Sequence, residues 1–106
     1  MVTKEKLTKE QEQLARFAKA LGHPIRVAIL QLLARQTCCY HGDMSERLPI
    51  AKSTLSQHLN ELKEAGLIRQ EAITLPSIKY CVCRKTWALA KQLFDGLSVE
   101  ITQSDK

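Results

Sequence analysis

The sequence predicts a mainly α-helical fold that carries one small β-hairpin. Apolar residues recur at helical spacing in four segments, and two runs of alternating β-branched and polar residues flank a single proline turn. The chain has 106 residues, of which 44% are hydrophobic and 25% are charged, which is typical of a soluble globular domain. A chain of this length holds one core and little room for a deep catalytic cleft. Residues 1–106 are therefore expected to form a single domain.

Two helices are expected in the first third of the chain. The first covers residues 8–21, because apolar side chains recur three and four residues apart along it. Gly22 interrupts it, and Pro24 suits the first turn of a second helix that reaches about Gln36. Residues 38–40 are β-compatible and are expected to form a brief strand.

A helix-turn-helix unit is expected over residues 43–65. Asp43 can cap a short helix that ends near Leu48, and a tight turn at residues 49–51 leads into a longer helix. This longer helix is expected from Lys52 to Ala65, with three leucines on one side.

A hairpin and a final helix complete the predicted fold. Gly66 ends the preceding helix, and two strands over about residues 67–83 flank a turn at residues 75–77. The last helix is expected over about residues 85–101, along one continuous apolar stripe. This order of elements is that of a winged helix-turn-helix, in which the second helix of the pair enters the major groove and the hairpin is the wing.

The helix at residues 52–65 has the side chains of a DNA-reading surface. Its hydroxyl and amide groups suit phosphate oxygens and base edges, Gln57 can pair bidentately with adenine, and basic wing residues can neutralise phosphates. The alternatives are an ordinary solvated face, a protein-docking surface and, for His58, a packed histidine beside Leu59. The expected DNA-binding residues are Lys52, Ser53, Thr54, Ser56, Gln57, His58, Asn60, Arg69 and Lys79.

The charge distribution agrees with a polyanionic partner. The net charge is +5, and residues 47–85 contain seven basic and three acidic groups. Such an excess suits double-stranded DNA or an anionic membrane surface. The longest apolar run, residues 27–30, is too short for a membrane span, and the first twenty residues lack a signal-peptide core, so a cytoplasmic protein with no membrane partner is expected. No phosphate-binding loop, dinucleotide fingerprint or metalloprotease motif is present, so an enzyme is not expected.

Two sequence runs resemble the ArsR/SmtB family of bacterial metalloregulatory repressors. They are Ala20-Leu21-Gly22-His23-Pro24-Ile25-Arg26 and Ser53-Thr54-Leu55-Ser56-Gln57-His58-Leu59, the second followed by Ala65-Gly66-Leu67-Ile68. The resemblance covers roughly residues 14–95 and implies a homodimer that binds an operator and represses transcription until an inducer binds. It implies dimerisation through the helices at about 8–21 and 85–101, although both apolar stripes could instead cover the monomer's own core. Ala51 departs from the family pattern, in which a serine or threonine caps the reading helix.

The four cysteines form two clusters, Cys38 with Cys39 and Cys81 with Cys83. In a cytoplasmic protein they are more often thiols or metal ligands than structural disulfides. The family's ligand positions do not carry over. The last helix has no histidine for the zinc site, and the three cysteine slots of the arsenic-sensing type are occupied by Tyr40, Gly42 and Ser45.

Pairing of residues 38–40 with the outgoing wing strand would bring the two clusters together, with Cys81 and Cys83 on one outward face. We expect Cys39 to act with Cys81 or Cys83, and Cys38 to be able to substitute. The expected inducer is trivalent arsenic or antimony, because a pyramidal centre takes two or three sulfurs. The alternative is redox or sulfane-sulfur sensing through a disulfide such as Cys39–Cys81. Zinc would need four ligands and could enlist His41. No cofactor is expected to be required.

Overall fold

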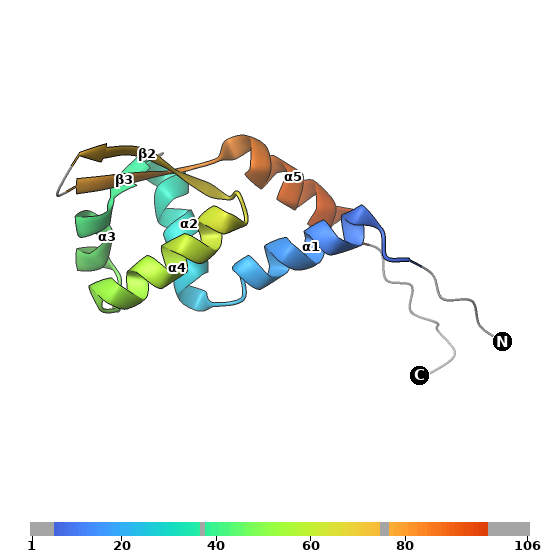
Figure 1. Ribbon diagram of the computed structural model, residues 1–106, viewed down its shortest axis with the longest axis horizontal. Helices are drawn as coiled ribbons and strands as arrows, with labels where there is room; N and C mark the ends of the chain where they lie inside the picture. The colour runs from blue at the N-terminus through green and yellow to red at the C-terminus, as the bar shows by residue number, and fades with distance from the viewer. Residues whose placement is uncertain (1–5, 37, 75–76, 98–106) are drawn as a thin grey trace.

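The computed structural model describes residues 6–36, 38–74 and 77–97. In these ranges, five helices and three strands follow one another in the order expected for a winged helix-turn-helix (Figure 1). They are α1 (Lys9–Ala20), α2 (Pro24–Gln36), β1 (Cys38–Tyr40), α3 (His41–Arg47), α4 (Lys52–Glu64), β2 (Ile68–Thr74), β3 (Ser77–Val82) and α5 (Arg84–Asp95). Within these described ranges, no helix combines the length and the apolar character that a membrane crossing requires.

The strands form one antiparallel sheet in the order β1-β3-β2. The expected pairing of the short strand with the outgoing wing strand is confirmed, with Cys38 opposite Cys81 and Cys39 opposite Tyr80. Because β3 lies in the centre, it links the wing to the segment that leads into the helix-turn-helix.

The core lies between the sheet and the helices. In α4 the apolar residues fall three and four positions apart, so one side of the helix is buried. Helix α2 and strand β3 supply further buried side chains to the same cluster. The fully or almost fully buried members include Ile29, Leu33, Met44, Leu55, Leu59, Leu62, Leu67, Ile68 and Val82.

Helix α4 ends where the sequence predicts. Gly66 has a φ of 82°, a left-handed conformation that favours glycine. The Gly66 N–H donates to the Lys63 carbonyl and the Leu67 N–H donates to the Leu62 carbonyl, at 2.9 and 3.1 Å. This pair of bonds is a Schellman motif, which turns the chain sharply from α4 into the wing.

Two expected helix boundaries are wrong. Helix α3 begins at His41, so Asp43 lies in its first turn and does not cap it; Tyr40 is the N-cap residue. Helix α5 ends at Asp95, because Gly96 takes the C-cap position, whereas the apolar stripe had suggested a helix to residue 101. Residues 98–101 and the turn residues 75–76 lie outside the described part of the chain.

Helices α1 and α5 run side by side at one end of the molecule, away from the sheet (Figure 1). Helix α1 begins with a capping box, in which the Thr8 hydroxyl accepts from the Gln11 N–H and the Gln11 side chain accepts from the Thr8 N–H. Phe17 and Ala20 of α1 and Ala90 of α5 are buried, whereas Leu89 and Leu97 remain 37% and 58% exposed. Part of the apolar stripe of the last helix is therefore not covered by the chain itself.

A candidate DNA-reading face and a cysteine pair

One side of α4 presents six of the expected DNA-binding residues to solvent. We call this group the reading face: Lys52, Ser53, Thr54, Ser56, Gln57 and Asn60. The opposite side of α4 packs its leucines in the core, so the orientation of the helix is fixed. Two side chains of the face make contacts within the protein: the Asn60 amide donates to Glu64 at 3.2 Å, and the Ser56 hydroxyl donates to the Lys52 carbonyl at 3.3 Å.

The start of α4 suits a negatively charged group. Ala51, the N-cap residue, makes no side-chain capping bond, and the first turn of α4 contains no acidic residue. The backbone N–H groups of that turn, together with the helix dipole, favour an anion such as a DNA phosphate.

His58 does not belong to the reading face, contrary to the sequence-based expectation. It is 9% exposed, and its Nδ1 accepts a hydrogen bond from Nε of Arg26 at 3.1 Å. The His23 ring lies 4.4 Å away, centroid to centroid. Burial, and then the charges of His23 and Arg26, lower the pKa of His58. The helical spacing of His58 from Leu55 and Leu62 is the signal that indicates its inward position.

The reading helix α4 is joined to α1 by one direct ion pair and by hydrogen bonds through Arg26 of α2. Arg26 also donates through Nη1 to the carbonyls of Lys19 and Ala20, at 2.9 and 3.3 Å, so it links His58 to the last turn of α1. Arg16 of α1 forms a 3.0 Å ion pair with Glu61 of α4. These long-range contacts were not predicted, because they depend on how the helices pack.

His41 connects the two helices of the helix-turn-helix unit. Its Nε2 lies 3.0 Å from the Ser56 hydroxyl on the reading face. His41 is the first residue of α3 and directly follows β1. The start of the reading helix is therefore coupled to the end of β1, and His41 is used here in a helix-helix contact.

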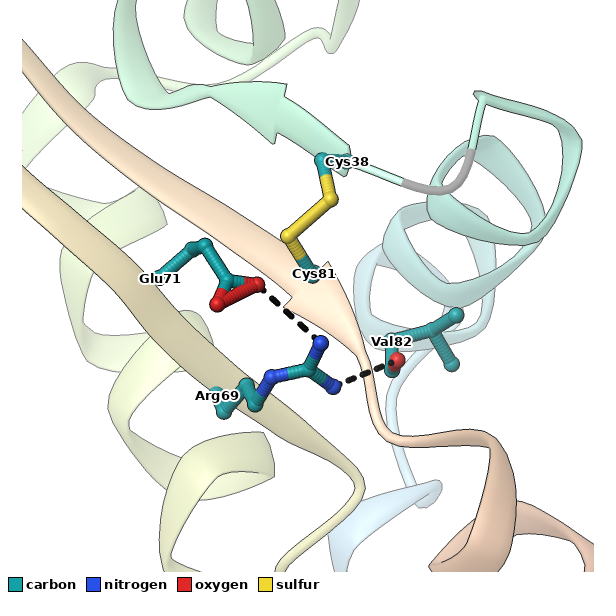
Figure 2. Close-up of a disulfide and its surroundings, with 5 residues drawn as sticks. All are labelled: Cys38, Arg69, Glu71, Cys81 and Val82. Carbon is teal, nitrogen blue, oxygen red and sulfur yellow. Dashed lines mark hydrogen bonds and ion pairs between the residues drawn. A yellow bond between two sulfur atoms is a disulfide. The ribbon is translucent and has the colours of Figure 1, made fainter.

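The two basic wing residues expected to bind DNA lie within the sheet, and Arg69 makes its contacts there. Arg69 forms a 3.0 Å ion pair with Glu71 and donates to the Val82 carbonyl at 3.3 Å, so its guanidinium lies beside the wing strands (Figure 2). Lys79 is half-buried and lies opposite Tyr40 in the sheet. The structure brings neither residue to the reading face.

Cys38 and Cys81 are joined by a disulfide that connects β1 to β3 (Figure 2). The sulfur atoms are 2.02 Å apart and the two Cα atoms are 4.1 Å apart. Cys81 is completely buried, which contradicts the expectation of an accessible outward thiol. We call Cys38 and Cys81 the cysteine pair.

Cys39 and Cys83 are not part of this pair. Cys39 is paired with Tyr80 in the sheet. Because successive residues of a strand point to opposite faces, the Cys39 side chain points away from the disulfide and is buried in the core. Burial, and then the Asp43 charge, raise the pKa of the Cys39 thiol. Cys83 has left the sheet and is the N-cap residue of α5, where its sulfur lies 3.2 Å from the Thr86 hydroxyl and that contact lowers its pKa. The expectation that Cys39 acts with Cys81 or Cys83 is therefore wrong.

A shallow groove follows the junction of α1 and α5. Its volume is about 660 Å³, and apolar side chains from both helices contribute to its lining, among them Leu14, Leu89, Leu93 and Leu97. Trp87 instead lines a smaller apolar pocket with Leu30 and Val82, and it packs against the monomer core.

Comparison with known proteins assigns the family. Residues 21–71 match the model of a helix-turn-helix domain family. The chain is 31% identical over 96 residues to the biofilm growth-associated repressor of Xylella fastidiosa, a match that covers 91% of this chain and 80% of that protein.

Solved structures agree with this assignment. The transcriptional repressor BigR of Xylella fastidiosa superposes with a TM-score of 0.66 at 25% identity, over 87% of this chain and 93% of that chain. An ArsR-like transcriptional regulator of Rhodococcus sp. RHA1 has the same fold, with a TM-score of 0.72 at 23% identity over 83% and 81% of the two chains. The protein therefore belongs to the ArsR family of winged helix-turn-helix transcriptional regulators.

Proposed function

We propose that the protein is a homodimeric repressor that binds operator DNA and is released when the cysteine pair is oxidised to a disulfide. The observation that supports this proposal best is the Cys38–Cys81 bond itself, because it joins the wing to the strand that precedes the helix-turn-helix. Family membership and the hydrogen-bonding reading face support DNA as the partner.

The cysteine pair has a short route to the reading helix. Cys38 begins β1, and β1 ends at Tyr40, which is the N-cap residue of α3. The next residue, His41, contacts Ser56 on the reading face. A covalent bond that fixes β1 against β3 therefore constrains the position of α3 and, through His41, the start of α4.

The sensing reaction balances with a two-electron oxidant. The two thiols lose two protons and two electrons, and one sulfur-sulfur bond forms, while a peroxide is reduced to water or alcohol. With a persulfide or polysulfide donor, one cysteine thiolate attacks the sulfane sulfur, the donor's sulfur-sulfur bond breaks, and the rest of the donor leaves as a thiol. The second cysteine then attacks the inner sulfur of the resulting persulfide and displaces hydrogen sulfide to give the same disulfide.

The repressor proposal is tested by comparing reduced and oxidised protein on DNA from upstream of its own gene. Fluorescence anisotropy should show specific binding by the reduced form, weakened about 5- to 150-fold on oxidation, the range of a 1–3 kcal/mol coupling. The Cys38→Ser variant should bind DNA but lose the response, whereas Cys39→Ser should keep it. Equal affinity of the two redox forms would contradict the sensing step.

A second candidate inducer is trivalent arsenic or antimony, held by the reduced cysteine pair. Two thiols on adjacent strands suit a centre that prefers sulfur ligands. The ligands would be Cys38 and Cys81 in place of the expected Cys39, which faces the core. Phenylarsine oxide added to the reduced protein should then release the DNA, and Cys38→Ser should abolish the release. Retained DNA binding in the wild type would exclude this inducer.

The homodimer part of the proposal rests on α1 and α5. Leucines of both helices line a groove at one end of the molecule, and Leu89 and Leu97 are exposed in the single chain. A second copy that covers these leucines would remove apolar area from water. Two-fold symmetry would then set the two reading helices about 34–36 Å apart, one turn of DNA.

A further inference from the structure

Glu71 occupies a β-bulge in the wing strand β2. Gln70 lies opposite Tyr80 and Ala72 lies opposite Lys79, so Glu71 has no partner residue on β3. A bulge adds one residue to a strand and re-aims its side chain, and bulges are common next to functional sites. Here the Glu71 side chain is directed toward the cysteine pair (Figure 2).

Three potential metal ligands meet at this position, one from each strand of the sheet. The sulfurs of Cys38 in β1 and Cys81 in β3 and a carboxylate oxygen of Glu71 in β2 all lie within 4.8 Å of one another. Arg69 forms a 3.0 Å ion pair with Glu71, and this positive neighbour orients the Glu71 carboxylate. In the part of the chain that the structure describes, no other set of three Cys, His, Asp or Glu side chains comes together in this way.

We propose that, in the reduced protein, Cys38, Cys81 and Glu71 bind a thiophilic divalent cation of the Zn²⁺ or Cd²⁺ class. The proposal deepens the proposed function, since it assigns a ligand to the reduced state of the same cysteine pair. A dithiol reductant first supplies two electrons and two protons to the disulfide and is itself oxidised to a disulfide. The cation then displaces the two thiol protons, which pass to solvent.

The donor set fits such a cation. Two Zn–S bonds of about 2.3 Å at a tetrahedral angle require sulfurs about 3.8 Å apart, a spacing that side chains opposite each other on adjacent strands reach by rotating about χ1. A carboxylate oxygen is the third ligand and water completes four-coordination. Two thiolates and a carboxylate carry three negative charges, which the cation and the Arg69 guanidinium balance. Because the cation and the disulfide use the same sulfur atoms, each excludes the other.

The acidic group near Cys39 provides a matched control. Cys39 and Glu46 line a separate pocket of about 210 Å³ on α3. A non-specific preference of the cation for any cysteine beside a glutamate would involve this pocket equally. The variants Glu71→Gln and Glu46→Gln therefore make the same chemical change beside a cysteine, but only Glu71→Gln alters the proposed site.

The experiment is a cadmium titration of the full chain, which is first reduced and then freed of the reductant under anaerobic conditions. Binding is detected by the thiolate-to-cadmium charge-transfer absorption, and zinc is added in a second titration as the competitor. The proposal predicts one ion per chain in the wild type, at least about a tenfold loss of affinity in Glu71→Gln, and wild-type affinity in Glu46→Gln and Cys39→Ser. Wild-type affinity in Glu71→Gln, or no saturable binding at one ion per chain, would overturn it.

The same variants separate this proposal from the redox function. Glu71→Gln retains both cysteines, so it should still form the disulfide and still lose operator affinity on oxidation. Cys38→Ser should lose both the cation site and the redox response. An intact redox response without cation binding in the wild type overturns the metal site alone, whereas cation binding without any redox effect on DNA overturns only the redox proposal.

Discussion

Arg26 donates a hydrogen bond from Nε to Nδ1 of His58 at 3.1 Å, and this bond ties the second helix of the chain to the reading helix. The same guanidinium donates to carbonyls in the last turn of α1. Arg26 therefore connects α1, which we propose as a dimer helix, to α4. The bond needs a neutral His58, because a protonated Nδ1 cannot accept.

Stability should depend on pH through His58. Its pKa in the folded protein is lowered from 6.5, so below about pH 6.5 the unfolded chain takes up a proton that the folded chain resists. The free energy of unfolding should therefore fall as the pH drops through 6.5 toward the lower folded pKa. In His58→Asn, Oδ1 can accept from Arg26 without titrating, so the slope should be smaller.

Urea denaturation between pH 7.5 and 5 measures this difference. His41→Asn serves as the control, because it removes another histidine and leaves His58 and Arg26 unchanged. Identical slopes for the wild type and His58→Asn would show that His58 does not couple to folding.

Sequence discrimination should depend on Gln57, which is exposed on the reading face. Gln57→Ala should weaken binding to the specific operator by about 1–3 kcal/mol, because a bidentate base contact is lost, with little effect on non-specific DNA. Anisotropy on both DNAs at fixed salt measures the ratio. Gln31→Ala, an exposed glutamine on α2, should leave both affinities unchanged. If Gln57→Ala keeps full operator affinity, Gln57 is not a base contact.

The turn after α4 should be sensitive to a side chain at Gly66. A Cβ there would meet the Thr86 side chain at 3.5 Å, an ordinary contact, so the cost arises from the left-handed backbone. Gly66→Ala should destabilise the fold by about 1–2 kcal/mol in urea denaturation. Gly42 has open space around it and no positive φ, so Gly42→Ala should cost no stability. A neutral Gly66→Ala would contradict the strained conformation.

The proposed dimer should depend on Leu89. Leu89→Glu introduces a charge into the leucine-lined groove and should raise the dimer dissociation constant at least about tenfold, which sedimentation velocity measures. Its neighbour Ala88 is exposed and does not line the groove, so Ala88→Glu is the matched control. Equal dissociation constants for the two variants would move the interface away from this groove.

The sequence predicted most of the fold, because the four longer helices have apolar residues at helical spacing and the turns have glycine or proline. The α4 leucines and Gly66 are examples in which local pattern and structure agree. The end of α5 was missed, since the apolar stripe continues beyond Gly96 although the helix does not. Strand alternation allows only one cysteine of the adjacent pair to face Cys81; the sequence analysis favoured Cys39, whereas the structure places Cys38 there.

The choice between Cys38 and Cys39 depends on register, and register is a tertiary property. Cys38 lies opposite Cys81 only because Cys39 is paired with Tyr80, whose ring belongs to the core. In the same way, the sequence does not indicate that Glu71 approaches Cys38 and Cys81, because the bulge that re-aims Glu71 arises from the pairing of two strands. Contacts between distant segments were the part that sequence patterns did not provide.

The disulfide encloses the DNA-binding unit in a covalent ring. Residues 38 and 81 are 43 positions apart, and α3, α4 and β2 all lie between them. Closing a ring of this size removes conformational entropy from the unfolded chain that corresponds to about 4 kcal/mol of stability. Oxidation thus makes the same segment harder to unfold and harder for a protease to cut. The redox state of one bond would then set the lifetime of the protein as well as its occupancy of DNA.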